Sequence, residues 1–573
     1  MTSQQLLLTI FLPLAGALAL WVVAPLGRSA ARVTALVVTL LTLFCAGQLT
    51  IGYPAGTDYA VTDVAWLSGG PGTINAAPVD IRFSVGLDGL GVWLFGLSAL
   101  LFVTAVLVSW EAISDRAPLF YAMLLLLEFG CLGVFVARDI ILFYVFFEFT
   151  LIPLFFLIGI WGSEDRRHAA VKFFLFTLAG SLLTFLGLLA IVLWDYQHSG
   201  EGTMRFSIAQ LTEGLTQHPM HRDWQLLVFL ALFAGFAIKV PLFPLHTWLP
   251  LAHVQAPTAG SVILAGILLK IGVYGFLRFS VPMLPDATVA CLPAMMWLAV
   301  AGIIYGALVA LAQTDLKKLI AYSSVSHLGY CMLGLFALNA TGVQGSVLQM
   351  VNHGLSTGAL FAIVGMLYER YHTRQIADLS GLALRTPWLA FFMVLFTFSS
   401  IGVPGLNGFA GEFLILLGAF QRAWSDAPLV WRGQLIVVAV LALSGVVLGA
   451  WYMLWLVQRV FFGPLKSPHT AHGDESETPV DLSLREIFAL APLAVFVVWI
   501  GIRPGDFLSR MAPTLDAARG PAVAALDKLR GNEQPPVANL VPRVLPGNAL
   551  PRGSASLADG EIDRRFGEGG SSR

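Results

Sequence analysis

The chain contains about fourteen apolar runs, each long enough to cross the roughly 30 Å hydrocarbon core of a bilayer. Of its 573 residues, 57% are hydrophobic and only 12% are charged, too few to give water-soluble domains of this size a polar surface. The runs therefore predict an all-α polytopic membrane protein. Its expected spans lie near 5–25, 32–52, 85–110, 117–137, 140–161, 168–194, 224–249, 257–280, 287–312, 318–338, 345–370, 387–421, 433–462 and 484–502.

Basic residues predict the orientation of these spans. Connections that follow odd-numbered spans carry more Lys and Arg than the others, with examples at Arg28, Arg166, Lys317 and Arg374. Because basic loops remain in the cytoplasm and an even number of spans leaves both ends on one side, both termini are predicted to be periplasmic. The first run has no Lys or Arg before it, so we interpret it as a retained span and not as a signal peptide.

Several classes of function have no signature in this sequence. The four cysteines lie within apolar runs and form no Cys-x-x-Cys pair, so we expect neither an iron–sulfur cluster nor a zinc site. The sequence has no Gly-x-Gly-x-x-Gly turn after a strand and no phosphate-binding Walker loop, and the net charge of −1 gives no reason to expect nucleic acid. Energy must then come from a partner protein or from an ion gradient.

Four ionisable side chains lie deep in the apolar spans, at Glu148, Lys239, Lys270 and Glu412. A charged group at the centre of a span costs about 2.5–3.5 kcal/mol on translocon-insertion scales, so each of these positions needs a reason. Pro257 opens the helix that contains Lys270. From the rise per residue, Lys270 lies about 20 Å along that helix from Pro257, near the bilayer centre. A set of buried acids and bases is what a proton path requires, and we interpret these four residues in that way.

Two spans contain residues that interrupt a helix. Pro241 and Pro244 follow Lys239 in the seventh span, and Pro404 with several glycines precedes Glu412 in the twelfth. Broken helices in corresponding positions are the usual trace of an inverted repeat with its ion site at the breaks. We therefore predict two inverted five-helix repeats. The expected domains are 1–116 with spans 1–3, 117–280 and 287–462 as the two repeats, and 484–502 as the final span.

Two other segments are poor in apolar residues. Residues 503–573 are rich in Pro, Gly, Ser and scattered charge, and we predict a disordered tail there. The segment 53–84, rich in Gly, Pro and Asp, is predicted to form turns outside the membrane. Neither segment is assigned any chemistry.

Four stretches of the sequence carry a resemblance to a known family. They are Phe147–Pro153, Lys239–Ser261 with its four prolines and two histidines, Asp315–His327, and Gly408–Glu412. Over nearly its whole length up to the tail, the chain resembles the antiporter-like membrane subunits of respiratory complex I known as subunit M in bacteria and chain 4 in mitochondria. Related subunits usually have a lysine where this chain has Glu412, so that residue favours the M type.

The resemblance implies a row of proton carriers: a coupling pair, a central relay, two intermediate histidines and an outlet group toward the periplasm. In that order, the residues at these positions are Glu148 with Lys239, Lys270, His327 with His353, and Glu412. Electrostatics is consistent with a coupling pair. At an effective dielectric constant of about 20, drawing a Lys–Glu pair from about 4 Å to about 8 Å apart removes roughly 2 kcal/mol of attraction, so separation favours proton release.

The resemblance also implies a wider assembly. The chain would be one subunit of a proton-translocating NADH:quinone oxidoreductase in a bacterial inner membrane, beside other membrane subunits that include neighbouring antiporter-like ones. This chain would hold no cofactor and no metal. NAD, FMN, iron–sulfur clusters and quinone are expected in partner subunits.

Structural roles compete with functional ones at several positions. Glu148 with Lys239 could be a static ion pair, and the two relay histidines could each hydrogen-bond a neighbouring helix. Glu128 is either an auxiliary coupling carboxylate or a satisfied contact between helices. The remaining candidates are expected to be structural: interfacial anchoring for Asp315, Lys317 and Lys318, and bonds to proline-freed carbonyls for His246 and His253.

Two other functions fit the sequence less well. One is a subunit of a multisubunit cation/proton antiporter or of a membrane-bound hydrogenase, whose usual lysine at position 412 is replaced here by glutamate. The other is a solute carrier, but the polar groups here are titratable and spread over at least five spans, unlike a compact pocket for a small molecule.

Overall fold

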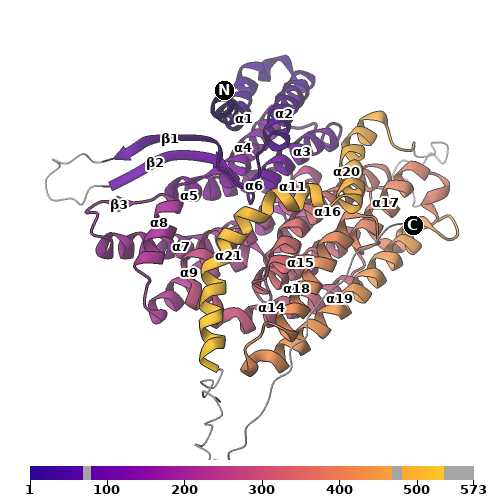
Figure 1. Ribbon diagram of the computed structural model, residues 1–573. Helices are drawn as coiled ribbons and strands as arrows, with labels where there is room; N and C mark the ends of the chain where they lie inside the picture. Colours follow the sequence, from indigo (N-terminus) through magenta and orange to yellow (C-terminus); the bar gives the residue numbers. More distant parts are fainter. Residues whose placement is uncertain (69–78, 467–479, 534–573) are drawn as a thin grey trace, which may run out of the picture.

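Within residues 1–68, 79–466 and 480–533, which the computed structural model describes, the chain is a bundle of long helices (Figure 1). The N-terminal part consists of α1 (Thr2–Val23), α2 (Arg28–Ile51) and α3 (Val92–Val108). Between α2 and α3, strands β1 (Tyr59–Ser68) and β2 (Val79–Leu87) form an antiparallel hairpin, and β3 (Met204–Arg205) pairs with β2 in parallel. The prediction of turns alone for 53–84 is therefore wrong, because alternating Val, Ile, Phe and Trp side chains build two strands there.

The next part of the chain contains short helices as well as long ones. Its elements are α4 (Ala117–Val136), α5 (Ile140–Phe149), α6 (Leu151–Trp161), α7 (Arg166–His198), α8 (Ile208–Gln217), α9 (Arg222–Lys239), α10 (Trp248–Gln255), α11 (Thr258–Ile263), α12 (Leu269–Gly275) and α13 (Val281–Met283). Two π-helical turns, η2 (Leu264–Leu268) and η3 (Phe276–Ser280), flank α12. Asp139 starts α5 by accepting hydrogen bonds from the backbone N–H groups of Ile141 and Leu142.

The following part repeats the pattern of long helices with one interruption. Its elements are α14 (Pro285–Leu311), α15 (Leu316–Phe336), α16 (Ala340–Tyr371), α17 (Pro387–Ser400), α18 (Asn407–Trp424) and α19 (Leu429–Phe461). Asp315 starts α15 in the same way that Asp139 starts α5. The helices α15 and α16 are almost wholly buried inside the protein, whereas α19 exposes much of its apolar surface, as expected for a helix that faces lipid.

Eleven helices in the described ranges are long and apolar enough to cross a membrane. The three predicted spans outside this count are the third, whose helix α3 is shorter than predicted because 84–87 belongs to β2, and the two broken ones. The polytopic all-α prediction is confirmed.

Both predicted interruptions are present. In the first, α9 ends at Lys239, and an irregular segment containing Pro241 and Pro244 leads to α10. In the second, α17 ends at Ser400, and α18 begins at Asn407. Gly408 allows the second break to close, because a Cβ there would lie 1.9 Å from the carbonyl oxygen of Ser399.

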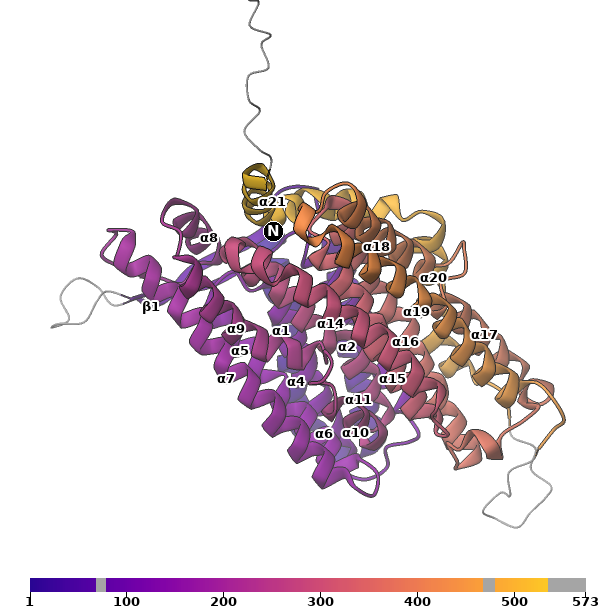
Figure 2. The same cartoon turned by 90° about the horizontal axis from the view of Figure 1, so that it is seen from below.

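A final span, α20 (Leu484–Ile502), leads into α21 (Gly505–Glu533). The prediction of disorder for 503–573 is therefore wrong for 505–533, and its remainder, 534–573, lies outside the described residues. Phe507, Met511, Leu515 and Leu526 are buried along one side of α21, which contacts α13, α14 and α16. Figure 2 shows this helix at one end of the bundle. Burial of that apolar side explains the helix despite the low overall hydrophobicity of the segment.

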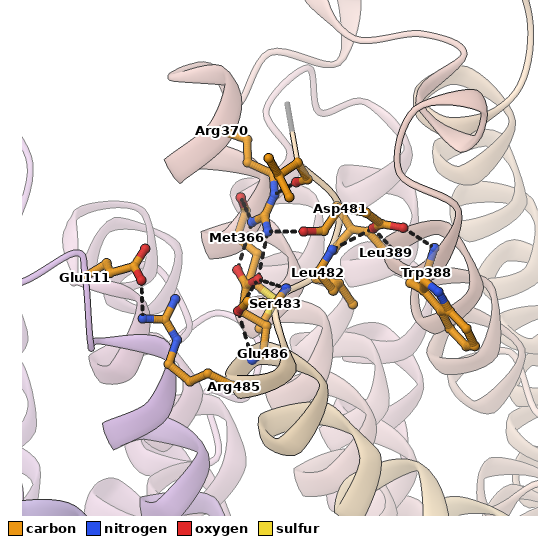
Figure 3. A network of polar contacts seen from close by, with 11 residues as sticks. Glu111, Met366, Arg370, Trp388, Leu389, Asp481, Leu482, Ser483, Arg485 and Glu486 are labelled. Atoms are coloured by element: carbon orange, nitrogen blue, oxygen red, sulfur yellow. Dashed lines mark hydrogen bonds and ion pairs between the residues drawn. The ribbon is translucent and has the colours of Figure 1, made fainter. Parts of the chain in front are cut away.

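A polar network ties three helix ends together (Figure 3). Arg370, near the end of α16, donates two hydrogen bonds of 2.7 and 2.8 Å to the carboxylate of Glu486 on α20. Asp481 accepts from the backbone N–H of Trp388 and of Leu389 at the start of α17. The network therefore holds the start of the second broken helix against its neighbours.

Candidate proton path

The first group of buried charges lies where α9 stops. Lys239 is the last residue of α9, its side chain is buried, and its ammonium lies 4.6 Å from the centre of the Phe147 ring on α5. Glu148 follows Phe147, so its carboxylate and Lys239 attract each other electrostatically. No ion pair with an N···O distance of 4.0 Å or less joins the two residues within the described ranges. The predicted pair therefore consists of neighbours without direct contact, so a small displacement of Lys239 changes their attraction.

Glu128 on α4 belongs to the same region. It is fully buried, and neither carboxylate oxygen has a hydrogen-bond partner in the structure. The buried thiol of Cys131, one turn further along α4, lies near both Glu128 and Lys239. Buried carboxylates in proteins are normally hydrogen-bonded, and none of the described residues bonds this one, so an auxiliary part in coupling stays a prediction for Glu128.

The first break holds two histidines whose predicted bonds to free carbonyls are absent. His253 on α10 is completely buried, and none of the described residues hydrogen-bonds either of its ring nitrogens. Its ring stacks on Phe361 with 4.5 Å between centres, and it interacts electrostatically with Lys317 and Lys270. The Nδ1 of His246 likewise has no partner. Instead, the indole N–H of Trp248 donates to one freed carbonyl, that of Ile238.

Lys317 is buried as well, and its ammonium donates to the carbonyl of Ala256 at 2.5 Å. Interfacial anchoring stays a prediction for Lys317, whose side chain is turned into the protein, and Lys318 beside it is exposed. Asp315 is occupied as the cap of α15 and lies 3.7 Å from Arg374. His253 is therefore near both Lys317 and Lys270.

Lys270 is completely buried on α12, between the two π-helical turns. Its ammonium donates to the carbonyl of Ala265, five residues earlier in the chain. It also lies 2.6 Å from the Nδ1 of His353 on α16. The α12 segment touches the end of α9, since a Cβ on Gly272 would lie 2.9 Å from the backbone nitrogen of Val240. The helix that carries the central lysine therefore contacts the end of α9, and Lys270 itself contacts a histidine.

His353 is followed by two further titratable residues, His327 and Glu412, near the second break. Its ring centre lies 5.6 Å from that of His327 on α15. His327 lies 3.1 Å from Glu412 Oε1 through Nδ1 and 3.1 Å from the hydroxyl of Ser400 through Nε2. Glu412 is buried on α18 and also accepts a hydrogen bond from Gln349. The structure therefore brings together four of the six residues in the expected row of carriers: Lys270, His353, His327 and Glu412.

Both histidines line a small cavity of about 10 Å³, which is close to the size needed for one water molecule. The Nε2 of His353 and the Oδ1 of Asn352 are buried near it without a hydrogen-bond partner. The cavity is also lined by Ser356 and Ser399. Its polar walls come from both pieces of the broken helix and from α15 and α16.

Sequence reasoning missed most of the uncharged residues around this cavity. Gln349, Asn352 and Ser356 recur on one face of α16 at intervals of three and four. Asn352 donates to the carbonyl of Asn407, and the hydroxyl of Ser399 donates to the Asn407 side chain. Polar side chains at helical spacing within an otherwise apolar span were the signal that could have identified them.

The three helix-breaking prolines lie where they were expected. Pro241 and Pro244 occupy the irregular segment after α9, and Pro404 lies between α17 and α18. Among residues 1–68, 79–466 and 480–533, no group of three or more His, Cys, Asp or Glu is arranged to hold a metal ion.

Comparison with known proteins adds independent findings. Residues 137–436 match the family described as the transmembrane region of NADH:quinone oxidoreductase and the Mrp antiporter. The chain is 40% identical to subunit M of NADH-quinone oxidoreductase from Rhodobacter capsulatus, over 88% of this chain and 94% of the relative. It is 39% identical to chain 4 of NADH-ubiquinone oxidoreductase from Chondrus crispus, over 89% and 96% respectively.

A solved structure agrees with these relatives. One chain of respiratory complex I from Thermus thermophilus with bound NADH matches with a TM-score of 0.74 and 32% identity. The match covers 92% of this chain and all of that chain.

Proposed function

Since the chain belongs to the family of M subunits, or chain 4, of NADH-quinone oxidoreductase, we propose that it moves protons across the membrane through its buried acidic, lysine and histidine side chains. NADH oxidation and quinone reduction take place in partner subunits, which hold the NAD, FMN, iron–sulfur clusters and quinone. This subunit supplies the path for the proton. Its partners are the other membrane subunits of the complex, and its location is a bacterial inner membrane.

One observation carries the proposal: titratable groups follow one another from the middle of the bundle to the second break. Lys270 contacts His353 at 2.6 Å, and His327 contacts Glu412 at 3.1 Å. Proton transfer between side chains needs a hydrogen bond or one intervening water. His353 and His327 both line the 10 Å³ cavity, and a single water there would connect the two contacts. A purely structural role gives no reason for this succession of titratable groups.

The first charged group would control the supply of protons to Lys270. Glu148 and Lys239 lie near each other without an ion pair, and Glu128 lies in the same region. When Lys239 moves toward Glu148, its positive charge moves relative to Lys270, and at an effective dielectric constant of about 20 such shifts are worth a few kcal/mol. We assign Glu128 an auxiliary part in this step. Strain from a neighbouring subunit would supply the movement.

His253 is the best placed group for proton uptake from the side where Lys317 lies. It is buried, its nitrogens are free of hydrogen bonds, and it interacts with both Lys317 and Lys270. Basic loops place that side in the cytoplasm, which puts both termini and the outlet beyond Glu412 on the periplasmic side. The two inverted repeats predicted for 117–280 and 287–462 would supply one broken helix each.

The alternative, a subunit of a cation/proton antiporter or of a membrane-bound hydrogenase, is less well supported. The matched family includes the Mrp antiporter. However, the relatives reported above at about 40% identity are M or chain 4 subunits, and Glu412 pairs with His327 where those other complexes usually have lysine. A complex I function explains both findings.

Replacement of Lys270 by Met tests the proposal. K270M keeps a long, unbranched side chain in the buried site but removes the proton-binding group. In inverted membrane vesicles that still contain the assembled complex, we expect NADH-driven proton uptake to fall by about 100-fold or more. The matched control is K318M, which changes an exposed lysine and should leave uptake unaltered. Wild-type uptake by assembled K270M would contradict the proposal.

A further inference from the structure

A largely apolar groove lies on the opposite side of α16 from the second break. It has a volume of about 360 Å³ and is formed by α2, α3, α16, α20 and the start of α21. Its inner end is lined by Leu43, Leu100 and Leu355, which lie well inside their helices. Its outer end is at Trp93 and Arg510, where α3 and α21 begin. The groove therefore runs from the membrane surface toward the interior of the bundle.

The depth of the groove suits a hydrocarbon chain. Its lining on α2 extends from Leu43 to Ile51, and on α3 from Trp93 to Leu100. At 1.5 Å per residue, these stretches correspond to roughly 10–12 Å along the membrane normal. The exposed side chains of Ile51 and Trp499 show that its rim is open at the surface of the subunit. An acyl chain that enters there would be surrounded by apolar side chains over much of its length.

The outer end carries a positive charge suited to a phosphate. Arg510 donates hydrogen bonds to the carbonyls of Thr50 and Ile51, and its guanidinium lies 5.8 Å from the centre of the Trp93 ring. No carboxylate lies within 4.0 Å of this guanidinium among the described residues. Asp506, which also lines the groove, is paired with Arg503 at 3.4 Å and accepts a hydrogen bond from the indole N–H of Trp499. Arginine and tryptophan together at the end of a span are typical of the headgroup level.

We propose that this groove binds one membrane phospholipid, with an acyl chain between α2, α3 and α16 and with the lipid phosphate on Arg510. The bound chain would cover the back of α16, the helix that carries His353 on another side. Val351 and Leu355 line the groove, and they flank His353 in the sequence. The lipid would thus pack against the helix of the proton path without taking part in proton transfer. This inference does not depend on the proposed function.

Photochemical labelling of the assembled complex tests the site. The complex is placed in vesicles of phosphatidylethanolamine and phosphatidylglycerol that contain a phosphatidylglycerol with a photoreactive diazirine in its acyl chain. After illumination, labelled peptides are identified by mass spectrometry. We expect label on residues 43–51 of α2 and 93–100 of α3 in the wild-type subunit.

Two variants show whether the label comes from a lipid bound in the groove. Gly47→Phe places a ring in the groove, and a Cβ at Gly47 meets no atom within 4 Å, so the backbone can remain in place. The matched control is Gly433→Phe on α19, where a Cβ also meets nothing within 4 Å. Arg510→Gln removes the charge without adding bulk, with Arg432→Gln on exposed α19 surface as its control.

G47F should abolish labelling of α2 and α3, R510Q should reduce it about fivefold, and both controls should keep it. Because R510Q adds no volume, it decides the question even where G47F fails to assemble. Labelling that is equal in the wild type, G47F and R510Q would overturn the proposal. Label confined to peptides of another subunit, showing that a protein covers the groove, would also overturn it.

Discussion

Replacing His353 by Gln asks whether this residue carries a proton or only supports its neighbours. Its Nδ1 lies 2.6 Å from the ammonium of Lys270, and its ring centre lies 5.6 Å from that of His327. A glutamine at this position can still hydrogen-bond Lys270, but it does not bind a proton at neutral pH. The 2.6 Å from Lys270 to His353 and the 5.6 Å between the two histidine rings add up to roughly 8 Å. Without the imidazole of His353, a proton would have to cross a distance well beyond the reach of one hydrogen bond.

The loss of a positioned proton-transfer group typically costs about 10²–10⁴-fold in rate. This corresponds to about 2.7–5.4 kcal/mol of activation free energy. We therefore expect H353Q to lower NADH-driven acidification of inverted vesicles by at least about 100-fold while the complex still assembles. His198→Gln, at the exposed end of α7, is the matched control and should pump normally. Wild-type pumping by assembled H353Q would refute a carrier role for His353.

Three further substitutions test the surroundings of the path. Glu486→Gln leaves the guanidinium of Arg370 without its buried carboxylate, and we expect the solubilised complex to melt earlier by an amount equivalent to about 3 kcal/mol. Burial opposes ionisation of Asp88, but attraction to Arg278 at 2.6 Å keeps its pKa below the usual value. The resulting stability is present above about pH 4 and lost as pH falls through the lowered pKa. Asp88→Asn should therefore lower the melting temperature at neutral pH, but much less near pH 3. Finally, Gln349→Leu removes a donor to the outlet carboxylate and should slow pumping by roughly 10- to 100-fold without melting the complex earlier.

The sequence allowed the breaks and the central lysine to be predicted because each follows from local chemistry. Pro241 and Pro244, three residues apart, favour the end of a helix, since proline lacks the backbone donor and clashes with the preceding turn. Lys270 was identified because an ionisable group deep in an apolar run is costly. Arguments of this kind need no knowledge of which helices are neighbours.

Contacts between helices could not be predicted in this way. Lys270 and His353 are 83 positions apart, and their distance of 2.6 Å depends on how α12 packs against α16. For the same reason, the absence of a direct ion pair between Glu148 and Lys239 could not be foreseen. These distances are set by tertiary packing. The order of residues along one span does not show how that span packs against the others.

The helix α21 was missed for a different reason. Pro513 and Pro521 and a low content of apolar residues suggested disorder, and this outweighed a weaker signal. Phe507, Met511 and Leu515 recur every four residues, which is the pattern of an amphipathic helix. That stripe becomes stable only where the ends of α13, α14 and α16 cover it.

The most direct test of the account is the replacement of Glu148 by Gln. Assembly of E148Q in the membrane is confirmed first, and NADH-driven quinone reduction and proton uptake into inverted vesicles are then recorded together. If the attraction between Glu148 and Lys239 couples proton movement to the reaction, both activities should collapse while the complex remains assembled. If assembled E148Q retains both at wild-type rates, the carboxylate has no part in coupling, and the proton path must lie on other residues.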